Sequence, residues 1–110
     1  MISMTMTLPD ELAERIRPIS TWVPTILELS LLGFQTRAAA TANEVIQFLA
    51  TNPTIEEVLR YHISEAAQQR LQRLLTLNAN GMISEEEQCE LDELEALEHV
   101  MIMLKSRITP

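Results

Sequence analysis

Residues 2–8 read ISMTMTL, with apolar side chains at the even positions and hydroxyl side chains at the odd positions. A period of two that includes β-branched polar residues predicts a half-buried strand, and Pro9 ends it. No other segment of the sequence has a strand-like pattern, and a lone strand is unstable in water. This strand is therefore predicted to pair with the same strand of a second copy, which makes the protein a homodimer.

Two helices are predicted to follow this strand. Asp10 caps the first helix, and Pro18 limits it to about two turns. Ser20 or Thr21 caps the second helix, where Pro24 is acceptable because it falls in the first turn. The second helix is apolar almost all round, which predicts burial on nearly every side and again favours a dimer core.

The rest of the chain is predicted to be helical, and short motifs mark where its helices start and stop. Thr54 with Glu57 and Ser84 with Glu87 have the spacing of capping boxes. Gly81 suits a left-handed helix stop just before the second box. The expected fold class is mainly α, with an N-terminal strand paired across a homodimer, followed by an α-helical tail that contains a helical hairpin.

Composition and charge restrict the classes of partner and compartment. The chain has 110 residues, of which 46% are hydrophobic and only 4% aromatic, and its net charge at pH 7 is −8. Such a chain repels nucleic acid and anionic membranes overall, so that any contact with DNA must be local. The single cysteine, the absence of a signal-peptide pattern and the absence of a long apolar run predict a cytoplasmic protein without a membrane segment.

No pattern in the sequence is typical of catalysis or metal binding. His62 and His99 are far apart, and Cys89 has no general base near it in the sequence. Residues 76–87 approach the spacing of a calcium-binding loop, but Thr76 stands where that loop requires its first Asp. A glycine stop followed by a serine cap explains the same residues. We therefore predict no enzymatic activity, no metal and no cofactor.

Residues 5–16, TMTLPDELAERI, resemble the start of ribbon-helix-helix proteins, especially bacterial antitoxins. In that family two strands pair into a ribbon that enters the major groove of DNA. The resemblance implies a dimerisation module over residues 1–36, in which the hydroxyl residues of the strand face the bases. The N-terminus of the second helix would hold a phosphate. The DNA-binding residues implied in this way are Ser3, Thr5, Thr7, Ser20 and Thr21.

Residues 43–110 are predicted to form a helical partner-binding region. Segments such as Ser84-Glu85-Glu86-Glu87 and Leu97-Glu98-His99 resemble the C-terminal halves of small bacterial antitoxin-like proteins, in which an acidic tail wraps a basic toxin. Eight acidic residues lie between positions 85 and 98. They would steer a basic partner toward the tail, or they form only a solvated helix face.

A belt of five consecutive apolar residues occupies positions 100–104. One helix cannot bury five consecutive residues against one neighbour, so part of this belt needs a second surface. That surface is either the dimer core or a foreign partner. The candidate partner-binding residues are Leu97, Val100, Met101, Ile102, Met103 and Leu104.

The leading functional prediction is an antitoxin-like dimeric protein that neutralises a basic toxin through its acidic helical tail. By resemblance it would also regulate its own operon by DNA binding. The alternative is a helical homodimer that binds no DNA and acts as a structural adaptor, which the charge of residues 1–42 favours because they hold three Arg against four acidic residues. The expected partners are a second copy, a basic toxin and operator DNA.

Overall fold

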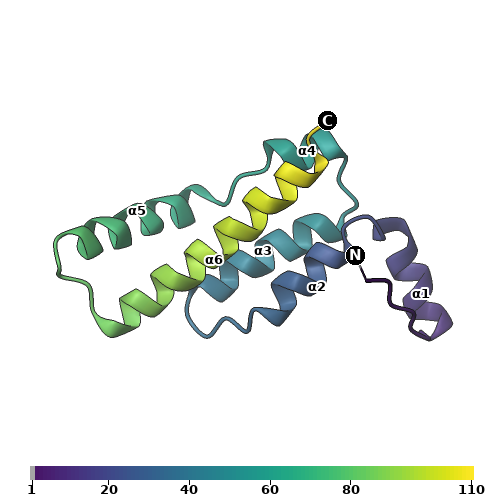
Figure 1. Cartoon of the computed structure of the whole chain (residues 1–110), viewed down its shortest axis with the longest axis horizontal. Coiled ribbons are helices and arrows are strands. Elements are labelled where there is room, and N and C mark those ends of the chain that lie inside the picture. Colours follow the sequence, from purple (N-terminus) through teal and green to yellow (C-terminus); the bar gives the residue numbers. More distant parts are fainter. Residues whose placement is uncertain (1) are drawn as a thin grey trace.

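The computed structural model describes residues 2–110, and every regular element in this range is helical. The longest helix, α6, extends along much of the molecule, which measures 51 × 28 × 27 Å. Helices α2, α3, α4 and α5 pack against it, whereas α1 lies apart at one side (Figure 1). The elements in chain order are α1 (Asp10–Ile16), the 3₁₀ helix η1 (Arg17–Ile19), α2 (Val23–Leu31), α3 (Ala38–Ala50), α4 (Ile55–Arg60), α5 (Glu65–Ala79) and α6 (Glu85–Ile108).

The predicted N-terminal strand is not present, and the ribbon-helix-helix prediction is therefore wrong. Residues 2–9 form neither strand nor helix, and residues 2–110 contain no sheet. The physical reason is that a strand needs a second strand to pair with its N–H and C=O groups. No other segment of the described chain supplies one, because every regular element after Pro9 is helical. Residue 1, which falls in the predicted module, lies outside the described residues.

The helix boundaries follow local chemistry at most of the predicted positions. Both capping boxes are confirmed. The backbone amide of Glu57 donates to the hydroxyl of Thr54 at 3.1 Å, and the backbone amide of Glu87 donates to the hydroxyl of Ser84 at 3.1 Å. Gly81 adopts a φ of +68°, as its role as a left-handed stop requires.

The predicted caps of α1 and α2 are wrong. Asp10 is the first residue of α1, the N-cap residue is Pro9, and no side chain caps this helix. The N-cap residue of α2 is Trp22, and no side chain caps this helix. Ser20 and Thr21 instead lie in the turn that joins η1 to α2, with exposed side chains. The indole of Trp22 is buried in the core, and this packing sets the position at which α2 begins.

The main core forms where α2, α3 and α4 pack on the second half of α6. A second, smaller cluster joins α5 to the first half of α6 and to the start of α3. Helices α5 and α6 form a hairpin: they run in opposite directions and are joined by the turn at Gly81 (Figure 1). The buried residues of the main core are Trp22, Leu29, Ala42, Val45, Leu49, Val58, Leu97, Val100, Met101 and Leu104.

The prediction that the second helix is buried on nearly every side is also wrong. Only Thr25 and Leu29 of α2 are buried, since this helix packs on α3 and α6 along one face. Leu27 and Leu31 are 48% and 83% exposed. Within residues 2–110, no helix combines the length and the apolar character that crossing a membrane requires.

Candidate functional site

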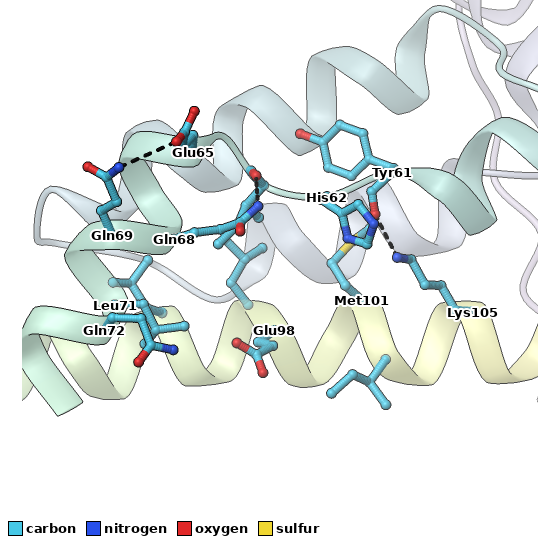
Figure 2. Close-up of a pocket in the computed structure, with 14 residues that line it drawn as sticks. Tyr61, His62, Glu65, Gln68, Gln69, Leu71, Gln72, Glu98, Met101 and Lys105 are labelled. Carbon is cyan, nitrogen blue, oxygen red and sulfur yellow. Dashed lines mark hydrogen bonds between the residues drawn. The ribbon is translucent and has the colours of Figure 1, made fainter. Parts of the chain in front are cut away.

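A groove of about 710 Å³ lies between α5, α6 and the segment that joins α4 to α5 (Figure 2). Leu71 of α5 packs with Leu94 in the smaller cluster, whereas Leu97 and Met101 of α6 belong to the main core. The groove therefore lies where the contacts of α6 change from one set of neighbours to the other. We call it the α5–α6 groove.

The floor of the α5–α6 groove is apolar. Four of its side chains, Leu71, Leu94, Leu97 and Met101, are buried, and Ile102 adds a more exposed apolar surface beside them. On α6 these residues recur at helical spacing along a single face. Because the methionine side chain adapts to many shapes, such a floor suits an apolar ligand surface.

The rim of the groove is polar, and several of its groups are held in place (Figure 2). The ammonium of Lys105 donates to the backbone carbonyl of Tyr61 at 2.6 Å, and the ring of Tyr61 stacks on Phe48 with centroids 4.3 Å apart. The side-chain amide of Gln68 donates to the carbonyl of Ile63 at 2.8 Å. These bonds fix the α4–α5 connection, which forms one wall of the groove.

The charges around the groove are unevenly placed. Lys105 lies at one end, and Glu98 and Glu65 follow toward the middle of the groove (Figure 2). The far end is neutral. Gln69 and Gln72 add neutral hydrogen-bonding groups on the α5 side. The groove therefore has an acidic part and a basic end, separated along the direction of α6.

Comparison of the chain with protein-family models, curated proteins and solved structures found no match. What the groove binds must therefore be inferred from its own residues. Within residues 2–110, no group of three or more His, Cys, Asp or Glu side chains gathers to hold a metal ion. An apolar floor with amides and carboxylates above it suits an amphipathic ligand, whose apolar face is buried while its polar face stays at the rim.

The six predicted partner-binding residues fall into two groups. Leu97, Val100, Met101 and Leu104 are buried in the main core of the same chain, where α2, α3 and α4 cover them. Ile102 and Met103 are 57% and 46% exposed. Of these two, Ile102 lines the α5–α6 groove and Met103 does not. The sequence could not show this division, because it depends on which helices fold back onto α6.

The five predicted DNA-binding residues are not brought together on a ribbon. Ser3, Thr5 and Thr7 lie in the extended N-terminal segment, and their side chains are exposed. Ser20 and Thr21 lie in the turn before α2, at the other end of α1 and η1. The arrangement implied by the family resemblance is therefore absent from residues 2–110.

The acidic run of α6 contains two kinds of carboxylate. Five are exposed, whereas Glu87, Glu90 and Glu93 are buried or partly buried and accept hydrogen bonds from other residues of the chain. Glu87 completes the second capping box, and the N–H of Ser84 holds the pKa of its carboxyl below the ordinary value. The exposed members of the run are Glu85, Glu86, Asp92, Glu95 and Glu98.

Glu90, which is buried, forms an ion pair with the partly exposed Arg70 across the α5–α6 hairpin. The guanidinium donates from Nε at 2.8 Å and from Nη2 at 3.0 Å, one bond to each carboxylate oxygen. This hydrogen bonding lowers the pKa of Glu90 below its ordinary value, although burial acts in the opposite direction. The pair joins the two helices that form the walls of the groove.

Glu93 accepts hydrogen bonds from the loop before α3, whose residues Gln35 and Thr36 are 58 and 57 positions away in the sequence. Its two oxygens accept the backbone N–H groups of Gln35 at 2.9 Å and Thr36 at 3.0 Å, and the hydroxyl of Thr36 also donates to it. Burial raises the pKa of Glu93, but these three hydrogen bonds outweigh burial and lower it overall. In the sequence this residue is only one member of the acidic run, because its partners come from a distant loop.

Glu93→Ala is expected to lower the free energy of unfolding by about 1–2 kcal/mol, because it leaves two N–H groups of the loop before α3 without an acceptor. The pKa of Glu93 is lowered in the fold, so its contribution is present above the ordinary value of about 4.3 and is lost as the pH falls through the lowered pKa. Urea unfolding at pH 7 and at pH 3 measures both effects. The exposed Glu95→Ala is the matched control, and equal losses in the two variants at pH 7 would contradict the role of Glu93.

Proposed function

We propose that this protein is a partner-binding protein whose α5–α6 groove holds an amphipathic segment of a basic protein. The observation that carries the proposal is a groove with an apolar floor, the exposed side chain of Ile102 beside this floor, and a rim of amides and carboxylates. A ligand with one apolar face and one basic face satisfies both parts of this site. Its apolar side chains would cover the floor, and its cations would meet Glu65 and Glu98.

The charge of the whole chain supports a basic partner. The net charge of −8 and the five exposed carboxylates of α6 attract a cationic protein before contact is made. Association is then expected to slow as salt screens these charges, since the Debye length is about 8 Å at physiological ionic strength. Neutralisation of a basic toxin, which the likeness of the tail to antitoxin-like proteins implies, is a specific form of this proposal.

Ile102→Arg is expected to weaken partner binding at least about tenfold. It removes an apolar side chain from the groove and places a cation where the proposed partner is basic. Met103→Arg is the matched control, because Met103 neighbours Ile102 on α6, is similarly exposed and does not line the groove.

The experiment starts from capture of partners by the tagged full chain in a nuclease-treated lysate of the native host, with identification by intact mass. The dissociation constant of the purified partner is then measured for the unchanged protein and both variants. One basic protein in stoichiometric yield that loses affinity only with Ile102→Arg supports the proposal. A partner that is acidic, or that responds equally to both variants, contradicts it.

A second candidate function is that of a helical homodimer acting as an adaptor. The observation that favours it is the exposed apolar surface of the N-terminal third, which lies apart from the groove residues in the sequence. Isolated apolar residues are ordinary on a surface, but a concentration of them marks interaction sites. The exposed residues are Ile2, Met4, Met6, Leu12, Leu27, Leu31 and Leu32.

For this second candidate, the chain is expected to sediment at about twice 12.5 kDa, and the double variant Leu27→Glu/Leu31→Glu is expected to sediment as a monomer. Charges placed on an apolar interface must be desolvated without partners, which opposes association. Analytical ultracentrifugation over a range of protein concentrations measures both. Sedimentation of the unchanged chain as a monomer at every concentration would contradict the homodimer.

A further inference from the structure

The two ends of the α5–α6 groove differ in charge, and this difference bears on how a ligand is oriented. Lys105 stands at one end, held by its bond to the carbonyl of Tyr61, while Glu98 and then Glu65 follow toward the other end (Figure 2). An ammonium has three donors, so Lys105 keeps two for a ligand after bonding to Tyr61. The charge at this end is therefore fixed in position and still able to bond.

The walls of the groove favour a helical ligand over an extended one. Most of the lining belongs to α5 and α6, whose backbone groups are already paired within each helix. An extended peptide would bring unpaired backbone N–H and C=O groups to these walls and find few partners there. A helix satisfies its own backbone and presents only side chains, as the apolar floor requires.

The length of the groove fits a short helix. On α6 the lining extends from Leu94 to Lys105, a separation of eleven residues, or about 16 Å at 1.5 Å per residue. A ligand helix of the same length has about three turns. Apolar residues at three- and four-residue spacing on such a helix would lie along the floor formed by Leu94, Leu97 and Met101.

We propose that the groove binds a three-turn amphipathic helix parallel to α6, with its amino-terminal end toward Glu65 and its carboxyl-terminal end at Lys105. A helix has a partial positive charge at its N-terminus and a partial negative charge at its C-terminus. In this orientation the C-terminus of the ligand helix meets Lys105, and basic side chains in its first half lie near Glu65 and Glu98. In the reverse orientation the partial positive charge of the N-terminus meets the ammonium of Lys105. This inference rests on the proposed function and adds the form and direction of the ligand.

The test uses two synthetic peptides of twelve residues built from leucine, alanine and lysine, identical in composition. One places its lysines in the N-terminal half, and the other is its reversed sequence. The full chain carries a nitroxide on Cys89, its single and exposed cysteine. Along α6, Cys89 lies about 8 Å from Leu94 and about 24 Å from Lys105. Because a nitroxide broadens the NMR signals of nearby nuclei most strongly, the broadened half of the peptide is the half that lies far from Lys105.

The expected result is at least fivefold tighter binding of the peptide with N-terminal lysines, with broadening confined to its N-terminal half. Lys105→Gln is expected to remove most of this preference, whereas Arg107→Gln, which changes the same charge outside the groove lining, is expected to retain it. Equal binding of the two peptides, or broadening of the C-terminal half, overturns the orientation and leaves the proposed function standing. If neither peptide binds more tightly than an acidic leucine–alanine–glutamate control peptide, both the orientation and the proposed function are overturned.

Discussion

Replacement of Trp22 by alanine is expected to lower the free energy of unfolding by about 3–5 kcal/mol, a large part of the stability of a chain of this size. The Trp22 side chain is only 2% exposed and packs in the core shared by α2, α3, α4 and α6. Its indole N–H donates to the carbonyl of Pro53 at 3.0 Å, across 31 residues of sequence. The substitution therefore creates a cavity and also leaves a carbonyl without its donor.

Trp22→Phe separates these two effects. Phenylalanine fills part of the same volume but has no N–H for Pro53, so a smaller loss of about 1–2 kcal/mol is expected. Urea unfolding followed by far-UV circular dichroism is the suitable measurement, because Trp22 is the single tryptophan and its fluorescence disappears in both variants. A loss below about 1 kcal/mol for Trp22→Ala would show that this side chain does not hold α2 to the core.

Arg70→Met is expected to lower the free energy of unfolding by about 3 kcal/mol at pH 7, because it leaves the carboxylate of Glu90 buried without its cation. The double variant Arg70→Met/Glu90→Leu removes both charges and replaces them with apolar side chains of comparable size. Such exchanges of buried pairs are close to neutral or stabilising, so the double variant is expected to recover most of the loss. Equal losses in the single and double variants would contradict this account.

The pH dependence of these variants provides a second check on the pair. In the unchanged chain, hydrogen bonding to Arg70 lowers the pKa of Glu90, so the fold binds fewer protons than the unfolded chain. This contribution is complete above about pH 4.3 and is lost as the pH falls through the lowered pKa. In Arg70→Met this hydrogen bond is lost, and burial and the charge of Glu87, which raise the pKa of Glu90, are opposed by the charge of Arg37. Protonation then relieves the buried charge. The stability difference between the two proteins is therefore expected to shrink as the pH falls from 7 to 4.

The ion pair also shows why the chemistry of the acidic run could only partly be predicted. Glu90 and Glu95 have the same side chain and lie on the same helix, but one is buried against Arg70 and the other is exposed. A pair twenty residues apart, on two different helices, has no spacing rule in the sequence. The exposed carboxylates could be predicted as a class, whereas the partners of Glu90 and Glu93 depend on how α3, α5 and α6 meet.

Local sequence by itself determined where α4 and α6 begin and where α5 ends, since capping boxes and a glycine stop act within a few residues. It also determined the charge that favours a basic partner. Only the tertiary structure decided that residues 2–9 form no strand, that α2 keeps one face exposed and that the apolar belt of α6 is divided between core and groove. The physical reason is that strand pairing and burial depend on the surface an element packs against. That surface is supplied by segments far away in the sequence.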